Sequence, residues 1–277
     1  MTKFDLHIHS NCSDGSDTVD ELAEKIKKAE IEIFALTDHD TVEGCKLMSE
    51  KFETGFIKGI ELTCLLEDIK CHILGYGIDT ENPKLKELIE KGKILRRKKL
   101  ETRIHYLKDT WDFEFTKEEL DWLYSRKSVV KTHLANILIK RGLAENNIAA
   151  MEKYLNGCKT GNTRFDGKEA IETIQQAGGI AVWAHPLGGE GEKHLAFDAF
   201  IPKLEKMLKY NIQGLECYYS RYNKEEIKFL TECAEKYNLY TTGGSDYHGT
   251  NKNIPLTKLN TDNTPVELEV LNFPKIY

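Results

Sequence analysis

The sequence predicts an α/β fold, a parallel sheet or barrel interrupted by a block of helices. Short apolar runs of strand length alternate with amphipathic helical segments over residues 1–80 and again after residue 161. Such alternation is typical of chains built from βα units. Residues 81–160 break this rhythm with long charged helical patterns. We therefore expect one barrel domain, made of residues 1–80 and 161–277, with a helical insertion at 81–160 over its mouth.

Each element of the barrel follows from local patterns. Thr18 to Glu21 has the spacing of a capping box, so a helix begins there. The apolar runs predict strands at 4–8, 31–37, 56–62, 71–76, 180–184, 214–218 and 239–242. Helical periodicity predicts further helices at 170–177, 200–210 and 225–237.

The insertion is predicted to be almost entirely helical. Asn82-Pro83 starts a charged helix that runs to about Asp109, because proline fits the first turn of a helix. A capping box at Thr116 opens a second helix, and a third is expected from Ser128 to Arg141. The only candidate strand in this region is 113–115.

Composition excludes several classes of protein. Of the 277 residues, 40% are hydrophobic, enough for a sizeable core, and the net charge of −6 argues against non-specific nucleic-acid binding over the whole surface. Seven scattered cysteines without a CxxC pair suggest reduced thiols in a cytoplasmic protein. The start of the sequence lacks a signal-peptide pattern, and no apolar run is long enough to span a membrane. No feature points to an obligate protein partner.

The histidines carry the functional signal, because most of the nine lie beside acidic residues at the ends of apolar runs. His7 and His9 are two apart on a strand and therefore point to the same face. In a βα barrel the strand ends form one rim where active sites lie. Several segments would then bring ligands to one mouth: His7, His9, Asp14, His39, Glu61, His72, His185, Asp246 and His248.

These nine candidates suggest a polynuclear metal site. One catalytic ion needs about four ligand positions, one of them open to water, so nine ligands suit two or three divalent ions. Mixed imidazole and carboxylate ligands fit zinc, iron or manganese without choosing among them. A single buried histidine such as His72 is more often a hydrogen-bonded core residue. Six such segments, however, each lie at the end of a predicted strand, and this agreement favours metal ligands over core histidines.

The motifs resemble those of the PHP (polymerase and histidinol phosphatase) superfamily. The matching segments are Asp5 to Ser10, Thr37 to Asp40, Trp183 to Pro186 and Gly244 to Gly249. The resemblance implies a distorted (β/α)7, TIM-like barrel with a trinuclear centre. It assigns His7, His9, Glu61 and Asp246 to one ion, Glu61, His72 and His185 to a second, and Asp14, His39 and His248 to a third.

The same resemblance suggests an activity. Asp14 and the insertion look like the branch of small PHP phosphoesterases, which includes nucleoside 3′,5′-bisphosphate phosphatases and an exonuclease acting on the 5′ ends of short RNA. We therefore expect hydrolysis of a small phosphorylated substrate, a nucleotide or short RNA, by attack of metal-bound hydroxide. The catalytic candidates are Asp14, His39, Glu61 and His248. Asp14, His39 or His248 could protonate the leaving oxygen, but a metal-bound residue is a poor acid, and a metal-bound water is the alternative.

Cations of the insertion are candidates for substrate binding. Arg96, Arg97 and Lys99 lie on the long charged helix, and an arginine fork suits a second phosphate. Leu100 and Leu107 lie beside the cationic face, which is expected to meet the barrel rim. A solvated helix face is the alternative reading of these charges. His133 matches the last residue of an Arg-Pro-His pattern that related proteins use to contact substrate, with an ordinary surface histidine as its alternative.

Two other functions remain open from the sequence. A histidinol-phosphate phosphatase would need a site for a cationic amine, which the basic helix disfavours. A non-catalytic metal-binding PHP module would be expected to have lost ligands, whereas all nine candidates are present. The sequence does not determine the metals, the physiological substrate, the oligomeric state, any lid motion of the insertion or the role of the C-terminal tail.

Overall fold

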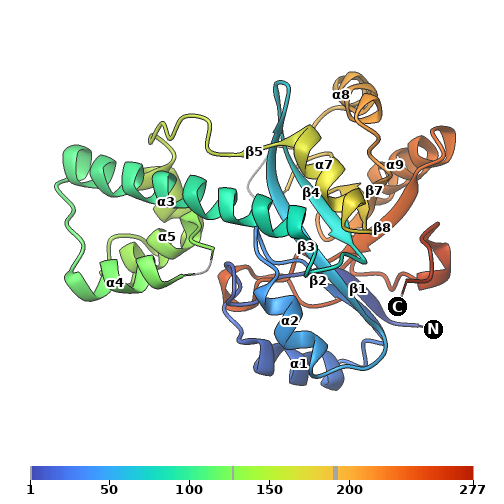
Figure 1. Ribbon diagram of the computed structural model, residues 1–277, viewed down its shortest axis with the longest axis horizontal. Helices are drawn as coiled ribbons and strands as arrows, with labels where there is room; N and C mark the ends of the chain where they lie inside the picture. The colour runs from blue at the N-terminus through green and yellow to red at the C-terminus, as the bar shows by residue number, and fades with distance from the viewer. Residues whose placement is uncertain (1, 127, 190–192, 277) are drawn as a thin grey trace.

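A computed structural model describes residues 2–126, 128–189 and 193–276. Its sheet curls into a nearly closed barrel with helices packed outside, which confirms the predicted α/β fold (Figure 1). Seven strands follow one another around the barrel: β1 (Phe4–Ile8), β2 (Ile33–Leu36), β3 (Phe56–Leu66), β4 (Ile69–Tyr76), β6 (Ile180–Trp183), β7 (Gly214–Tyr219) and β8 (Tyr240–Gly244). Backbone bonds just beyond β8 close the barrel, since Asp246 N donates to His7 O at 2.9 Å and His9 N to Tyr247 O at 2.9 Å.

Most neighbouring strands are parallel, but β4 is antiparallel to both β3 and β6. The expectation of a purely parallel sheet is therefore wrong at this strand. Only Glu67 and Asp68 separate β3 from β4, and Glu67 has a φ of 52°. A parallel pairing needs a crossover of a dozen or more residues, so this short turn can only form a hairpin.

Five helices cover the barrel: α1 (Val19–Lys28), α2 (Glu43–Ser49), α7 (Gly167–Gln176), α8 (Phe197–Lys209) and α9 (Lys224–Lys236). The capping box predicted at Thr18 is present, with Glu21 N donating to the Thr18 hydroxyl. Helix α2 was not expected from the sequence, and its N-terminal residue Val42 makes no side-chain cap. The short strand β5 (Phe165–Asp166), which pairs with β3, was not expected either.

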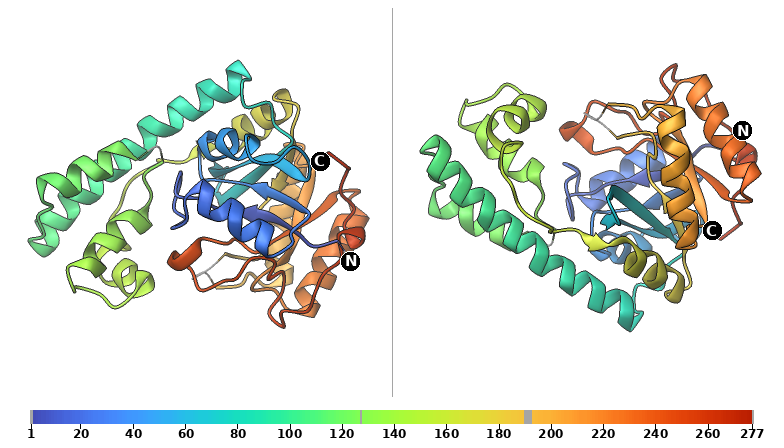
Figure 2. Two further views of the ribbon diagram at one scale, coloured as in Figure 1. Left: turned by 90° about the horizontal axis from the view of Figure 1, so that it is seen from below. Right: turned by 90° about the horizontal axis from the view of Figure 1, so that it is seen from above.

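The insertion consists of α3 (Pro83–Trp111), α4 (Lys117–Ser125), α5 (Lys131–Lys140), α6 (Asn147–Ala150) and the π-helical turn η1 (Met151–Leu155). It projects to one side of the barrel, and α3 runs from α7 to its far end (Figures 1 and 2). Leu100 and Leu107 lie in a hydrophobic core of the insertion itself. These leucines therefore do not pack on the barrel rim, whereas Arg96 of the cationic face does reach the barrel, at Asp40 and Thr63.

Two further details of the insertion differ from expectation. Helix α5 begins at Lys131 rather than Ser128, because Val130 just before it is extended. Ser128, Val129 and Val130 are buried ahead of the helix. Residues 113–115 form no strand, and the rings of Phe113 and Phe115 pack edge to face instead.

Two short 3₁₀ turns, η2 (Gly249–Asn251) and η3 (Leu268–Val270), follow the last strand of the barrel. Within the residues that the structure describes, none of the helices combines the length and the apolar character needed to cross a membrane.

Candidate metal centre

The ends of the barrel strands bring the nine candidate ligands into one buried cluster. His7 and His9 come from β1 and the residues after it, and both are fully buried. Gly244 ends β8 so close to β1 that an added Cβ would lie 2.1 Å from the Cβ of His7. His185 and Asp246 have φ values of 29° and 59°, a conformation that costs free energy and clusters at functional sites. The backbone is thus shaped to aim these side chains.

One group of ligand atoms surrounds the imidazoles of β1. His7 Nε2 lies 3.1 Å from His9 Nε2, 3.3 Å from Glu61 Oε2 and 3.6 Å from Asp246 Oδ1. His9 Nε2 lies 3.2 Å from Glu61 Oε2 and 3.4 Å from Asp246 Oδ1. These four side chains are the set that the resemblance assigned to the first ion.

Glu61 also faces a second group of histidines. Its Oε1 atom lies 2.8 Å from His72 Nδ1 and 3.2 Å from His185 Nε2. His39 Nδ1 lies 3.0 Å from the other oxygen, Oε2. The carboxylate therefore has one oxygen toward each group, which is the arrangement of a bridging ligand.

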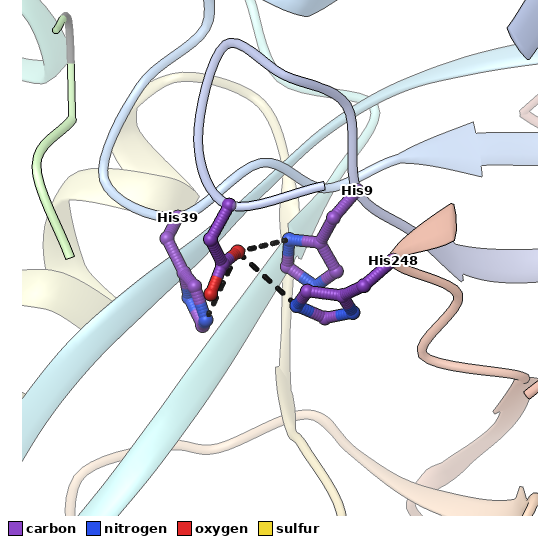
Figure 3. A group of neighbouring side chains, drawn as sticks. His9, His39 and His248 are labelled. Atoms are coloured by element: carbon purple, nitrogen blue, oxygen red, sulfur yellow. Dashed lines mark ion pairs between the residues drawn. The ribbon is translucent and has the colours of Figure 1, made fainter. Parts of the chain in front are cut away.

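Asp14 forms a third group with three histidines, His9, His39 and His248, which Figure 3 labels. Its Oδ1 atom lies 3.1 Å from His248 Nε2 and 3.9 Å from both His9 Nδ1 and His39 Nε2. His9 thus lies between the first and third groups, and His39 between the second and third. All nine predicted ligands meet in one continuous cluster.

The donor atoms fit divalent ions. Four buried atoms of the cluster make no well-directed hydrogen bond among the described residues, although they approach one another in pairs at 3.0 and 3.1 Å: His39 Nδ1 with Glu61 Oε2, and His248 Nε2 with Asp14 Oδ1. An unsatisfied buried polar atom is costly, and metal coordination satisfies it without a protein partner. The nitrogen and oxygen ligands match zinc, iron or manganese.

The charges of the cluster favour the same conclusion. Burial alone would raise the pKa of Glu61, but the nearby imidazoles of His39 and His7 outweigh it and hold the pKa well below its ordinary value. Asp14 behaves alike, with His248 and His39 overcoming burial to lower its pKa. These carboxylates are therefore ionised at neutral pH, the form that binds cations.

Burial keeps part of the imidazole set neutral. It lowers the pKa of His72 to about 4 in spite of the adjacent Glu61 carboxylate. The pKa of His248 is lowered by burial and then by the charge of Lys252. Both rings therefore keep a nitrogen lone pair available for a metal at neutral pH.

Glu216 supports the cluster from behind and was missed in the sequence. This fully buried residue of β7 accepts from His7 Nδ1 at 2.8 Å and from the His185 backbone N at 2.7 Å. A carboxylate on the second nitrogen of a ligating histidine fixes its tautomer and orientation. The one charged residue within the apolar run of Gly214–Tyr219 was the available signal.

The loop after β1 is held in place by Asp38. Its carboxylate accepts from Ser10 N at 2.8 Å, from the Ser10 hydroxyl at 2.7 Å and from the Ser13 hydroxyl at 2.5 Å. This loop carries Asp14, so the bonds hold a candidate metal ligand in place through its backbone. Asp38 was noted in the sequence as part of the histidine motif, and the structure places it behind the ligands.

The predicted substrate-binding cations occupy different environments. Arg96 is buried and paired with Asp40, and it also donates to Thr63 Oγ1 at 3.2 Å. Arg97 is exposed and stacks on the Tyr124 ring at 4.3 Å. Arg96 thus joins the insertion to the loop after β2, whereas Arg97 contacts α4, since it also donates to Tyr124 O at 3.2 Å.

His133 is buried and held at both ring edges. Its Nδ1 atom accepts from Val130 N at 3.0 Å, and the backbone of Ser13 also hydrogen-bonds to the ring. Burial lowers its pKa to about 4, so the ring is neutral. His133 therefore ties α5 to the loop that carries Asp14.

Lys99 is the third predicted cation, and it is partly buried. It forms no salt bridge to any residue that the structure describes, and burial followed by the charges of Arg103 and Arg96 lowers its pKa to about 7. Arg103, one turn further along α3, has a buried Nε atom without a partner in the described part of the chain. Arg164 adds to the same positive potential.

The family model of the PHP domain matches residues 5–162, more than half of the 277-residue chain. The chain belongs to this family. The PHP-family protein is 29% identical over 255 residues to a 5′-3′ exoribonuclease of Haemophilus influenzae, covering 89% of the chain and 90% of the relative. It is 27% identical to a phosphoribosyl 1,2-cyclic phosphate 1,2-diphosphodiesterase of Eggerthella lenta, covering 91% and 96%.

Another relative and a solved structure resemble the PHP-family protein over nearly its whole length. A 3′,5′-nucleoside bisphosphate phosphatase of Chromobacterium violaceum is 25% identical, with 90% of this chain and 88% of the relative covered. The structure of a candidate metal-dependent phosphoesterase from Bifidobacterium adolescentis superposes with a TM-score of 0.80 at 24% identity, covering 97% of this chain and 98% of the other. The latter shows a common fold that includes the insertion.

Proposed function

We propose that this PHP-family protein hydrolyses phosphate esters of small nucleotides, such as nucleoside 3′,5′-bisphosphates, or of the 5′ ends of short RNA. The chain is a metal-dependent phosphoric ester hydrolase. The named relatives support the substrate class, since they include a bisphosphate phosphatase and an exoribonuclease. A nucleotide carrying more than one phosphate is favoured by the cations beside the centre.

The nine-residue cluster is the observation that carries the proposal. Its three groups of donor atoms share His9, His39 and Glu61, so two or three divalent ions would lie close together. Such ions, when bound, supply Lewis-acid activation of water and neutralise charge on phosphoryl oxygens. We assign them to manganese, zinc or iron from the ligand chemistry.

The chain's own side chains orient the ligands and the substrate. Glu216 holds His7 in one tautomer, and Asp38 fixes the loop that presents Asp14. The imidazole of His133 joins α5 to the same loop, so the insertion is aligned with the centre. These contacts give a prearranged site, in which little reorganisation is needed when a phosphate enters.

A cluster of cations beside the centre would hold a second phosphate. Its members are Lys99, Arg103, Lys131 and Arg164. Arg164 lines a cavity of about 180 Å³ together with His72 and His185, so the cluster adjoins the metal ligands.

The cations of this cluster lower one another's pKa values. Burial and then Arg103 lower the pKa of Lys131 to about 8, and burial lowers that of Arg103 to about 10. Neighbouring, partly buried cations are unfavourable unless enough negative charge joins them, and the carboxylate that acts on Lys99, Asp40, is already paired with Arg96. The forked guanidinium of arginine matches phosphate oxygens.

Phosphate release from a panel of esters tests the function. The panel contains adenosine 3′,5′-bisphosphate, AMP, a 5′-phosphorylated trinucleotide, phosphoribosyl 1,2-cyclic phosphate and histidinol phosphate, each with manganese and with a chelator. We expect chelator-sensitive release that is fastest from the esters with two phosphates. Release from histidinol phosphate alone, or release unaffected by the chelator, would contradict the proposal.

A further inference from the structure

A polar cavity of about 790 Å³ lies between the insertion and the end of the barrel. It is lined by residues of α5, α6 and η1 and by the segment after β8, and it reaches the metal ligand His248. Its volume is in the range of small-molecule sites. Amide groups dominate its polar lining, which contains Asn136, Asn146, Asn147, Asn156, Asn251 and Asn253.

Asn251 fixes the orientation of two of these amides. Its Oδ1 atom accepts from Asn136 Nδ2 at 3.2 Å, and its backbone O accepts from Asn147 Nδ2 at 3.3 Å. Asn251 Nδ2 in turn donates to Asp14 O at 2.8 Å, so this network is continuous with the metal centre. The side-chain nitrogens of Asn136 and Asn147 therefore both donate to Asn251. Their side-chain oxygens take no part in these bonds.

Asn147 has the clearest unused group. Its Oδ1 atom is buried and has no hydrogen-bond partner within the described residues. Leaving an amide oxygen in this state is costly, and a small turn of the Asn147 side chain toward the cavity would let it accept from an N–H donor outside the protein. Apolar side chains of Ile139, Ile148 and Met151 line the same cavity. The cavity thus offers apolar contact for a flat ring and a hydrogen-bond acceptor for its edge.

We propose that this cavity binds the nucleobase of the substrate, with Asn147 Oδ1 accepting a hydrogen bond from an exocyclic amine. The inference rests on the proposed function and adds base recognition to it. The cavity is not a strong phosphate site as a whole, because Glu145 and Glu152 in its lining offset the charges of Lys131 and Lys252. Lys131 lines the cavity and belongs to the cation cluster, so a base here and a phosphate there can belong to one nucleotide. Asparagine side chains commonly read amine-bearing base edges.

Three substrates that differ only in the base test the proposal. They are adenosine 3′,5′-bisphosphate, its purine riboside analogue without the exocyclic amine, and ribose 3,5-bisphosphate without a base. For the natural chain we expect kcat/KM to be about 10-fold higher for the adenosine compound than for the purine compound, because a buried acceptor is left unpaired in the second. The base-free compound should be the poorest.

The variant Asn147→Ala should abolish this discrimination. Its kcat/KM for the adenosine compound should fall to that for the purine compound, while turnover of the base-free compound stays within about twofold. Asn272→Ala, which removes an exposed asparagine of the C-terminal tail, is the matched control and should keep the natural preference. Equal rates on the adenosine and purine compounds in the natural chain would overturn base recognition by Asn147.

Binding measurements separate the two proposals and do not depend on the variant folding. Calorimetry with adenosine and with purine riboside on the natural, manganese-loaded chain should show tighter binding of adenosine. Equal binding would overturn the pocket. Preferential binding of adenosine without hydrolysis of any phosphate ester would support the pocket and contradict the proposed function.

Discussion

Glu61 is the ligand whose two oxygens face two different groups of histidines. Glu61→Gln removes the negative charge between them while keeping the shape of the side chain. Residues that only hydrogen-bond to a metal ligand typically cost about 10- to 100-fold in activity when they are replaced. Because Glu61 would contact the ions directly, we expect phosphate release to fall by more than about 100-fold. The measurement is turnover combined with metal content per chain. Turnover within twofold of the natural chain would contradict a bridging role.

Glu216 acts through His7 and the backbone of His185. Glu216→Gln should lower metal affinity by about 10–100-fold, because His7 loses the carboxylate that fixes its tautomer. Competition with a metal-binding dye measures this directly, and higher metal concentration should restore most of the turnover. Glu235→Gln, on the exposed side of α9, is the control and should leave affinity unchanged.

Lys99 gives a pH dependence with a definite sign. Its pKa of about 7 lies below the ordinary value for lysine, so it is protonated below pH 7 and loses its charge as the pH rises. Because kcat/KM reports groups of the free enzyme, its ratio for bisphosphate over monophosphate should fall by up to about 10-fold per pH unit above 7.

The control for this pH dependence is the neighbouring lysine. Lys99→Met should lower the ratio at pH 6 and remove most of its fall between pH 6 and 7, whereas Lys131, with its pKa of about 8, should still lower the ratio at higher pH. Lys98→Met, which removes an exposed charge on the same helix, should leave the natural profile unchanged. The same falling profile in Lys99→Met would show that another group binds the second phosphate.

At the scale of elements, the buried pair of Arg96 and Asp40 fastens α3 to the loop after β2. Arg96→Ala leaves Asp40 buried without its partner and should lower the free energy of unfolding by about 3–5 kcal/mol. The adjacent Arg97→Ala removes only an exposed arginine stacked on Tyr124 and should cost about 1 kcal/mol or less. Denaturant unfolding of both variants checks the difference, and equal losses would contradict it.

Much of the fold could be predicted because apolar runs mark the strands whatever their direction. All seven barrel strands were expected. The antiparallel direction of β4 was missed, although the connection after β3 is too short for a parallel pair. The packing of α3 was misjudged for another reason. Leu100 and Leu107 form an apolar stripe, and periodicity shows that a stripe is buried without showing which partner covers it.

The clustering of the nine candidate ligands could be predicted from the sequence, whereas the contacts of the cations could not. Histidine beside aspartate at strand ends is rare enough to stand out, and the barrel brings those ends together. The pairing of Arg96 with Asp40 and the ties of His133 to the backbone depend on distances between segments far apart in the sequence. Charge and helix phase alone could not separate these structural roles from substrate binding.

At the scale of the whole molecule, the centre should stabilise the fold. Its candidate ligands range from the first barrel strand to the segment after the last strand. Bound ions would therefore connect the first and last strands of the barrel. Metal at 100 times its dissociation constant should stabilise the chain by about 2.7 kcal/mol. That corresponds to a rise in Tm of about 5–10 °C over the chelated protein. The variant His7→Ala should show a much smaller rise, and an equal one would place the stabilising ion elsewhere.

The closure of the barrel between β8 and β1 also sets an order of events during synthesis. His7 and His9 leave the ribosome long before Asp246 and His248 can join them. A nascent chain therefore holds an incomplete ligand set until β8 docks beside β1. Full occupancy by metal can come only at the end of folding, so a chain cut short before β8 would be unable to hydrolyse its substrate prematurely.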